Sequence, residues 1–225
     1  MRVAAVPVKD LVNAKQRLIT VLTPAERVDL ARAMLRDVLG ALMGAGLDAV
    51  WVVSGDAEVA AIARRAGAAT LNEDCNRGHT AAVAQAQAEA ARRRARLFLT
   101  VPGDVPCTTA DEVAALIEVA ASGHPGVVFT PSRSGRGTNG AALAPPDIMP
   151  LVFGEPSFDN HLAAARARGL NPWVLPLAGL GLDVDELDDL RALLHQGPGT
   201  ESGRLVASWG IQLNEALPPS LQRAH

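Results

Sequence analysis

The two lysines of this chain lie close together near its N-terminus. Of 21 lysine and arginine residues, only Lys9 and Lys15 are lysines, and they follow the first apolar run. Pro7 ends that run, and Arg17 adds another cation just beyond. In α/β proteins the loop after the first strand commonly binds phosphate, and the compact lysine ammonium suits that task. The pattern predicts an anion-binding loop over 7–17, with a solvated basic loop as the alternative.

A carboxylate occupies a comparable position later in the chain. Asp104 lies in the stretch 101–106, Val-Pro-Gly-Asp-Val-Pro, directly after another apolar run. Ligands of open α/β sheets bind at the carboxyl ends of strands, and magnesium prefers one or two carboxylates together with substrate phosphates. We therefore predict that Asp104 holds a divalent cation. The alternative is that Asp104 only caps a helix beginning near Thr108 or Thr109.

A second group of acids follows at 183–189, with the sequence Asp-Val-Asp-Glu-Leu-Asp-Asp. Asp183 and Asp185 alternate, and on an extended segment they project to the same side. One of them could complete a metal site with Asp104. The last two acids of the stretch are better placed in the first turn of a helix, where they favour the helix dipole. Taken alone, the stretch would be an acidic helix start.

Residues 135–140 form a glycine-rich turn, Gly-Arg-Gly-Thr-Asn-Gly, before an apolar run. Small residues let backbone N–H groups approach an anion, and Thr138 and Asn139 add side-chain donors. Arg133 and Arg136 could give bidentate contacts to phosphate or carboxylate. A plain hairpin loop is the alternative.

Further along, Ser157 is a good N-cap for a helix that carries His161. Helix N-termini attract anions, which makes Ser157 a candidate ligand. A histidine at such a position more often packs or caps than catalyses, and we predict a packing or capping role for His161.

Several functional classes lack support. There is no Gly-x-Ser-x-Gly elbow, no Walker lysine motif and no Gly-x-Gly-x-x-Gly after the first apolar run. The net charge of −3 gives no electrostatic case for nucleic-acid binding. Two cysteines are too few for a disulfide framework, and no apolar stretch is long enough to span a membrane. We expect a cytoplasmic protein with neither nucleic-acid nor membrane partners.

Short apolar runs alternate with amphipathic stretches, which predicts an α/β three-layer sandwich with a mostly parallel, Rossmann-like sheet. The predicted strands are Val3–Val6, Ala49–Ser54, Leu97–Val101, Val127–Thr130, Ala141–Ala144 and Trp173–Leu175, and the predicted helices include Pro24–Ala45, Asp56–Ala66, Thr80–Ala91 and Thr109–Ala121. Thr23 and Pro24 are a strong helix start. We expect one domain over 1–196 with a substrate-side insertion around 131–160, and a linker and tail over 197–225.

Taken in order, the chemistry-bearing segments resemble the guanylyltransferases of coenzyme F-420 biosynthesis, in the molybdopterin-nucleotidyltransferase-like superfamily. The resemblance covers about residues 1–195. It rests on Pro7-Val8-Lys9 with Ala14-Lys15-Gln16-Arg17-Leu18, Pro102-Gly103-Asp104-Val105-Pro106, Gly137-Thr138-Asn139, Phe153-Gly154 with Ser157-Phe158 and His161, and Leu182-Asp183-Val184-Asp185. It implies a fold like that of nucleotide-diphospho-sugar transferases.

The resemblance also implies an activity: transfer of GMP from GTP to a three-carbon phospho-acid, with release of pyrophosphate. The acceptor would be 2-phospho-L-lactate, phosphoenolpyruvate or 3-phosphoglycerate, and the cofactor Mg²⁺. The implied acceptor ligands are Thr138, Asn139, Gly154 and Ser157; the nucleotide ligands are Pro7, Lys9, Lys15, Asn76, Gly78 and His79; the catalytic group is Lys9, Lys15, Arg17 and Asp104; and the metal ligands are Asp104 with Asp183 or Asp185.

One segment departs from the family pattern. The nucleotide-side loop of the family usually reads Gly-Leu-Asn followed by Ala, whereas His79 and Thr80 stand in the corresponding loop here. Guanine preference therefore stays open at this stage. Two alternatives also remain: a same-fold enzyme acting on a sugar phosphate, molybdopterin or phosphonate, and a non-catalytic nucleotide-binding domain. A homodimer is compatible with the sequence but not required by it.

Overall fold

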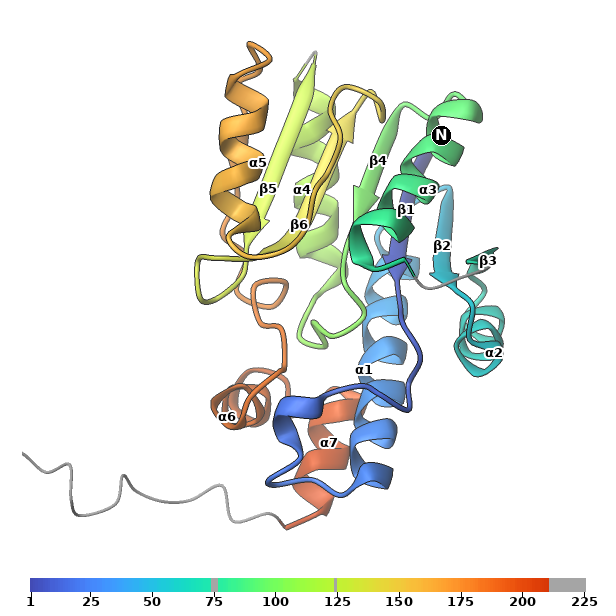
Figure 1. Ribbon diagram of the computed structural model, residues 1–225, viewed down its shortest axis with the longest axis vertical. Coiled ribbons are helices and arrows are strands. Elements are labelled where there is room, and N and C mark those ends of the chain that lie inside the picture. The colour runs from blue at the N-terminus through green and yellow to red at the C-terminus, as the bar shows by residue number, and fades with distance from the viewer. Residues whose placement is uncertain (74–76, 124, 211–225) are drawn as a thin grey trace, which may run out of the picture.

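The protein is built on one twisted sheet, seen in a computed structural model that describes residues 1–73, 77–123 and 125–210 (Figure 1). Seven strands pair in the order β3-β2-β1-β4-β6-β5-β7, and only β6 runs antiparallel to its neighbours. The strands are β1 (Arg2–Pro7), β2 (Ala49–Ser54), β3 (Ala69–Asn72), β4 (Leu97–Thr100), β5 (Gly126–Pro131), β6 (Thr138–Ala144) and β7 (Trp173–Val174). This confirms the predicted α/β class and the mostly parallel sheet.

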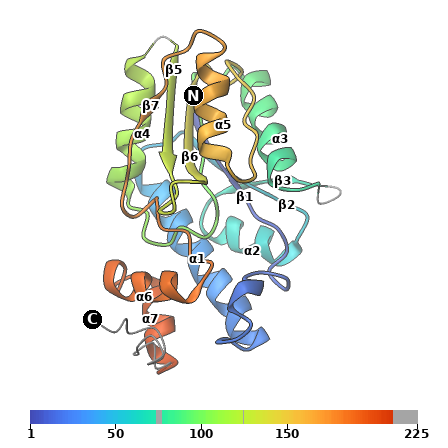
Figure 2. The ribbon, with the colours of Figure 1, turned by 60° about the vertical axis from the view of Figure 1, so that its left-hand side comes forward.

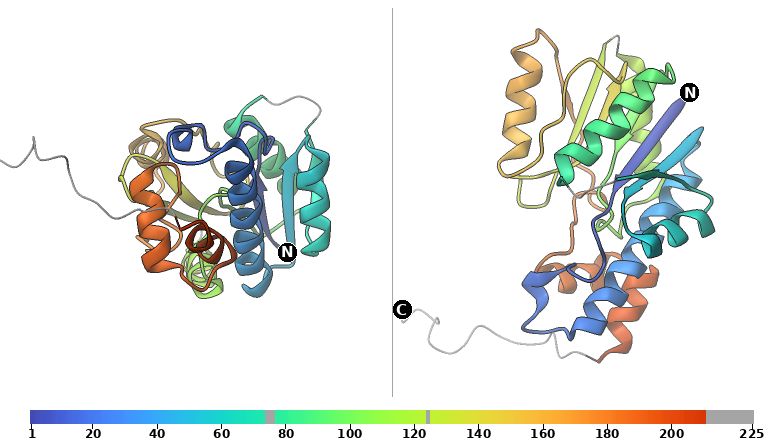
Figure 3. Two further views of the ribbon diagram at one scale, coloured as in Figure 1. Left: turned by 90° about the horizontal axis from the view of Figure 1, so that it is seen from below. Right: turned by 45° about the vertical axis from the view of Figure 1, so that its right-hand side comes forward.

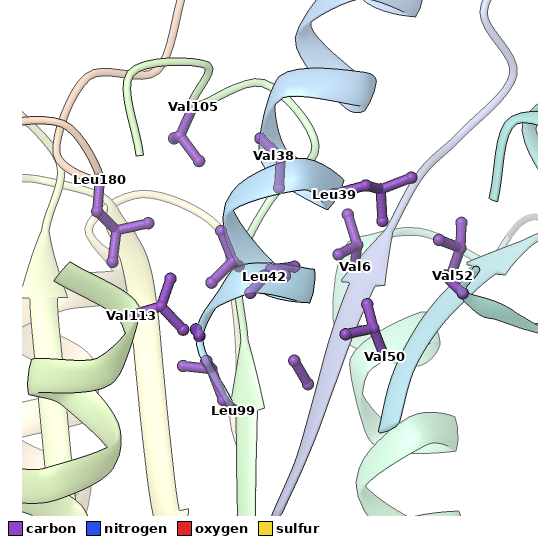
Figure 4. Packing of buried hydrophobic residues seen from close by; sticks show 14 of the residues in the cluster. Val6, Val38, Leu39, Leu42, Val50, Val52, Leu99, Val105, Val113 and Leu180 are labelled. Carbon is purple, nitrogen blue, oxygen red and sulfur yellow. The ribbon is translucent and has the colours of Figure 1, made fainter. Parts of the chain in front are cut away.

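Helices cover both faces of the sheet, as a three-layer arrangement requires. The helices are α1 (Pro24–Gly44), α2 (Ala57–Arg65), α3 (His79–Arg92), α4 (Ala110–Ser122), α5 (Ser157–Arg166), α6 (Leu187–Gln196) and α7 (Glu201–Ser208), with a 3₁₀ turn, η1 (Gln16–Leu18). Helices α1, α2 and α4 bury one face, where Leu39 and Leu42 pack in the same cluster as Val6 and Val52 (Figure 4). Helices α3 and α5 bury the other.

The reversed strand β6 decides where the second half of the chain lies. It inserts between β4 and β5, so that its first residue, Thr138, lies at the edge where the parallel strands end. The sequence places 131–160 in a substrate-side insertion, but β6 within that range is fully buried in the main sheet. Strand β3 is absent from the predicted strands because its alternation of apolar and polar residues lasts for only four positions, the shortest run that indicates a strand, and none of the four is buried.

A third apolar cluster lies beyond the sheet edge where β1 ends. Here α6 and α7 pack beside the N-terminal half of α1, burying Leu30, Met34, Leu190 and Val206 (Figure 2). Helix α7 stands where the sequence predicts a linker. Among the described residues, no helix is long and apolar enough to cross a membrane.

Helix α7 is held by a carboxylate of α1. Thr200 caps the helix by accepting from the Gly203 N–H, and Asp37 accepts from the backbone N–H groups of Glu201 and Ser202 at 2.7 and 2.9 Å. The Ser202 hydroxyl donates to the same carboxylate at 2.6 Å. A glycine-rich stretch reads as a linker because this contact, from a residue 165 positions away, cannot be seen in the local sequence.

Replacing Asp37 by alanine is expected to lower the free energy of unfolding by about 2 kcal/mol, because hydrogen bonds to a charged group contribute about 1.5–3 kcal/mol. Urea unfolding measures the change. Asp37→Asn, which keeps one acceptor oxygen, should lose less. Equal stability of the alanine variant and the wild type would show that α7 is not anchored through this carboxylate.

Candidate active site

The carboxyl ends of β1 and β4 open into a cavity of about 380 Å³. Pro7 and Lys9 line it after β1, Asp104 lines it after β4, and His79 and Asp185 close its sides. The segment 8–22 runs beside the start of α1 (Figure 3). Parallel strands end at one edge of the sheet, so the fold brings these side chains together from distant parts of the chain.

Lys15 is the central cation of this cavity. Its ammonium donates to Asp104 Oδ2 at 2.6 Å and to Asp185 Oδ1 at 2.8 Å, and only 7 % of the side chain is exposed. Burial opposes the charged form, but the two carboxylates outweigh it and raise the pKa of Lys15 to about 12. The backbone of Lys15 is left-handed, with φ 55° and ψ 43°, which a lysine adopts at a cost of about 1 kcal/mol. The structure therefore positions this ammonium between the two acids with precision.

The two alternating acids differ in their surroundings. Burial, together with the charges of Asp104 and Asp185, raises the pKa of Asp183, although Asn139 donates to its Oδ1 at 3.1 Å. Burial opposes ionisation of Asp185 as well, but Lys15 and Arg17 hold its pKa below the usual value. The Val184 N–H donates to the Asp104 carbonyl at 3.0 Å, which ties the two acidic segments together.

A second cavity, of about 480 Å³, adjoins the first and shares Asp185 with it. Arg17, Arg133 and Arg136 line it together with several acids. Within the described part of the chain, the ion pairs of these arginines are long and exposed, at 3.4 Å or more. An anionic ligand can therefore recruit them at little cost. The cavity suits a small molecule with more than one negative group.

Two buried hydroxyl groups lie close in sequence to residues that line this second cavity, Thr138 near Arg136 and Ser157 near Glu155. The Thr138 N–H donates to Ser157 Oγ at 3.0 Å, which joins the start of β6 to the start of α5. His161, on the next turn of α5, lies 3.0 Å from Thr138 Oγ1. Gly154 precedes α5 with φ 119°, a conformation that favours glycine, and the space where a side chain would stand is open.

The start of α3 lines a third, smaller cavity beside the first. Gly78 occupies the N-cap with φ 94° and lines a small adjoining cavity with Pro7, Lys9 and His79. Burial lowers the pKa of His79. The ring of His79 packs on that of Phe153 at 4.4 Å between centroids. Asn76, the other loop residue implied as a nucleotide ligand, lies outside the described residues.

Known proteins resemble this chain over nearly its whole length. The family described as "Guanylyl transferase CofC like" matches residues 1–224. The chain belongs to this family. Its relatives include the phosphoenolpyruvate guanylyltransferases of Rubrobacter xylanophilus, 41 % identical over 93 % of this chain and 95 % of the relative, and Sphaerobacter thermophilus, 43 % identical over 87 % and 94 %. The 2-phospho-L-lactate guanylyltransferase of Methanothermobacter thermautotrophicus is 37 % identical over 88 % and 86 %.

Solved structures agree on the fold. A protein described as a nucleotide-diphospho-sugar transferase from Desulfovibrio desulfuricans G20 superposes with a TM-score of 0.78 at 15 % identity, covering 95 % of this chain and 97 % of the other. A nucleotidyl transferase from Methanothermobacter thermautotrophicus gives 0.63 at 17 %, covering 87 % and 97 %. The CofC-like chain is thus a guanylyltransferase on a nucleotidyltransferase fold, and its family extends through α7, beyond the resemblance seen in the sequence.

The structure brings most of the proposed site residues of this CofC-like chain to one edge of the sheet. Lys9, Lys15, Asp104 and Asp185 line one cavity, and Asp183 lies in the next. The remaining predicted ligands within the described residues lie as follows: Arg17 lines the second cavity, Pro7, Gly78 and His79 line a small third cavity, Thr138, Asn139 and Ser157 are buried, and Gly154 is exposed next to Glu155, which lines the second cavity.

Two side chains gain a role that their local sequence does not indicate. Thr80, one of the two residues that depart from the family pattern, accepts from the Phe153 N–H at 2.9 Å and so joins the start of α3 to the loop before α5. The Phe153 ring meets both His79 and His161, with centroids 4.4 and 5.1 Å away. In the sequence, Phe153 followed by Gly154 indicates a turn, but it does not indicate which side chains the Phe153 ring contacts.

Protonation of His161 is expected to destabilise the fold. Burial lowers the pKa of His161 from 6.5 to about 4. Because the folded-state pKa lies below the unfolded-state value, this contribution is complete above pH 6.5, declines as the pH falls toward 4, and then levels off. The change amounts to about 3 kcal/mol at most.

The contribution of His161 is isolated by comparing urea unfolding of the wild type and His161→Asn from pH 7 to pH 4. Other groups titrate equally in both proteins, so the difference belongs to the imidazole. Parallel stability curves over this range would contradict a depressed pKa.

Proposed function

We propose that this guanylyltransferase transfers GMP from GTP to phosphoenolpyruvate, releasing pyrophosphate. The observation that carries the proposal is the pair of adjoining cavities, one lined by Lys9 and Lys15 and one by three arginines, which share Asp185. In the proposed reaction the triphosphate and the phospho-acid, both anions, must approach each other, and each of the two cavities supplies cations for one of them. Relatives at 41 % and 43 % identity are named for phosphoenolpyruvate, which favours that acceptor over 2-phospho-L-lactate and 3-phosphoglycerate.

Asp104 and Asp185 would hold a divalent ion, with Asp183 beside them. Their carboxylates fit this role because they already converge on one cation, the Lys15 ammonium. Among the described residues, no group of three or more His, Cys, Asp or Glu side chains could hold a metal alone. Two carboxylates completed by substrate phosphates are what magnesium prefers. Bound there, Mg²⁺ would neutralise charge on the triphosphate. A structural relative, Rv0371c of Mycobacterium tuberculosis, was solved in complex with manganese (TM-score 0.54, 20 % identity).

The chemistry needs no general base from the protein. A phosphate oxygen of the acceptor, already anionic at neutral pH, attacks the α-phosphorus of GTP. The new P–O bond forms as the bond to the β-phosphate bridging oxygen breaks, and pyrophosphate leaves with that electron pair. Lys9, Lys15 and Arg17 neutralise the anions and hold them in line, so that positioning and electrostatics supply the rate enhancement.

Purified protein incubated with GTP, Mg²⁺ and each of the three acids tests the proposal. We expect pyrophosphate release with phosphoenolpyruvate and a product whose mass equals that of the acceptor plus a guanylyl group. CTP and ATP in place of GTP test the base preference at His79. Pyrophosphate release with none of the acids, from protein that binds GTP, would overturn the acceptor class.

The guanylylated product would enter coenzyme F-420 biosynthesis, which is the pathway of the resembled family. A chain that bound GTP tightly but released no pyrophosphate with any acceptor would instead be a non-catalytic nucleotide-binding domain. The convergence of Lys15 on two carboxylates argues against that alternative, because a binding domain has no need of a strained cation between paired acids.

A further inference from the structure

Thr138, Ser157 and His161 form a buried hydrogen-bond network at the acceptor side. All three residues are at least 94 % buried, with exposed fractions of 6, 3 and 2 %. Thr138 Oγ1 lies 3.0 Å from His161 Nδ1, and the Ser157 hydroxyl donates to the same oxygen at 3.4 Å. The imidazole therefore touches a proposed acceptor ligand without lining the cavity itself.

The backbone fixes which nitrogen of the imidazole carries the proton. The Val152 N–H donates to His161 Nε2 at 3.0 Å, and a backbone N–H can only donate. Nε2 is therefore an acceptor and bears no hydrogen. A neutral imidazole carries one proton, so it lies on Nδ1, and Nδ1–H donates to Thr138 Oγ1.

The hydroxyl of Thr138 can make one further hydrogen bond, and only as a donor. Its oxygen accepts from His161 and from Ser157, which occupies both lone pairs. Its own proton must then be donated outward, and no hydrogen bond donated by this hydroxyl is found within the described part of the chain. Thr138 opens β6 at the sheet edge that carries the two cavities, so a ligand bound at that edge is the group left to accept this proton in a hydrogen bond.

We infer that His161 is a positioning residue that makes the Thr138 hydroxyl an obligatory hydrogen-bond donor to an anionic oxygen of the acceptor. The inference rests on the proposed function, in which Thr138 holds the acceptor acid. A hydroxyl free to rotate could equally present a lone pair, which an anion repels. The locked hydroxyl instead favours a negatively charged group over a neutral one.

Aromatic packing holds the imidazole in the plane in which it can bond both the Val152 N–H and the Thr138 hydroxyl. The Phe129 ring stacks on His161 with centroids 5.2 Å apart and an interplanar angle of 10°, and the Phe153 edge meets it at 75°. Phe153 is in turn bonded through its backbone to Thr80 at the nucleotide side. The orientation of the Thr138 hydroxyl is thereby set by packing from strand β5 and from the loop before α5, and not by exposed side chains.

Two substitutions test the inference, because each keeps one of the two hydrogen bonds of His161 and removes the other. In His161→Asn, the amide nitrogen falls near the position of Nδ1 and can still donate to Thr138, but the Val152 N–H loses its acceptor. In His161→Gln, the amide falls near Nε2 and can accept from Val152, but it no longer reaches Thr138. Steady-state kinetics with GTP and phosphoenolpyruvate, together with thermal unfolding, are measured for both.

We expect the two readouts to rank the variants in opposite orders. His161→Asn should keep the KM for phosphoenolpyruvate within about threefold of the wild type yet unfold a few degrees lower than His161→Gln. His161→Gln should raise that KM roughly tenfold or more, the loss associated with a hydrogen bond to a charged group, with kcat and the KM for GTP changed far less. If the KM instead followed thermal stability, or was equal in both variants, His161 would be a packing residue only.

Thr138→Val separates this inference from the proposed function. If it raises the KM for phosphoenolpyruvate while the two His161 variants do not differ, Thr138 is an acceptor ligand but is not oriented by His161. If Thr138→Val leaves that KM unchanged, the acceptor assignment itself fails. Long-range ¹H–¹⁵N NMR of the wild-type imidazole gives an independent readout, since a protonated Nε2 would overturn the tautomer on which the inference depends.

Discussion

Replacing Asp104 by asparagine is expected to lower kcat about a thousandfold while the protein folds normally. The carboxylate accepts from Lys15 at 2.6 Å and faces Asp185 across that ammonium, in the cavity that we propose for the triphosphate. The amide keeps the shape of the side chain and one acceptor oxygen but removes the negative charge that a divalent ion needs. Loss of one preorganised electrostatic group typically costs 10²–10³ in rate. Pyrophosphate release with GTP and phosphoenolpyruvate measures the loss.

Asp147→Asn is the matched control, because Asp147 is an exposed carboxylate beyond the end of β6, at the opposite edge of the sheet. The control should turn over like the wild type. Thermal unfolding of Asp104→Asn within a few degrees of the wild type would exclude misfolding as the cause, since only about a third of this side chain is exposed and its backbone contact to Val184 is unchanged. Near-normal turnover by Asp104→Asn would remove Asp104 from the metal site and from catalysis.

The sequence predicts those site residues that follow directly from strand ends. Lys9 and Asp104 come after β1 and β4, two adjacent parallel strands, so their proximity follows from the sheet alone. The period of an extended segment likewise places Asp183 and Asp185 on the same side, and the cavities of the structure place both at the site. Charged side chains at these positions can be recognised in the sequence because ligands of open α/β sheets bind at the carboxyl ends of the strands.

Other features depend on contacts that no local pattern carries. Lys15 meets carboxylates 89 and 170 residues away, so its place between them is invisible until the chain has folded. His161 reads as a packing histidine, and packing against Phe129 and Phe153 is part of what it does. Its hydrogen bond to Thr138 depends on a strand that reverses direction, β6, and on the backbone of Val152.

Lys15→Met is expected to lower the turnover number about a hundredfold or more and, in the same variant, to strengthen the binding of a divalent ion. In the wild type the ammonium neutralises Asp104 and Asp185, so an ion entering between them must displace it. Methionine fills a similar volume without charge and leaves the acids uncompensated. The variant should therefore unfold at lower temperature in EDTA, because breaking a buried ion pair by removing one partner is costly.

Added Mn²⁺ or Mg²⁺ should raise the melting temperature of Lys15→Met by about 4 °C more than that of the wild type, without nucleotide. That difference corresponds to roughly tenfold tighter binding, or about 1.4 kcal/mol. Lys9→Met is the control: Lys9 lines the same cavity, is exposed and has no ion pair among those the described residues form, so its loss should weaken GTP binding and leave the metal response unchanged. Equal metal responses in the wild type and Lys15→Met would mean that the ammonium and the ion do not share a position. A larger response confined to Lys15→Met would mean that the wild-type protein keeps its paired acids closed by its own cation until the triphosphate draws Lys15 away.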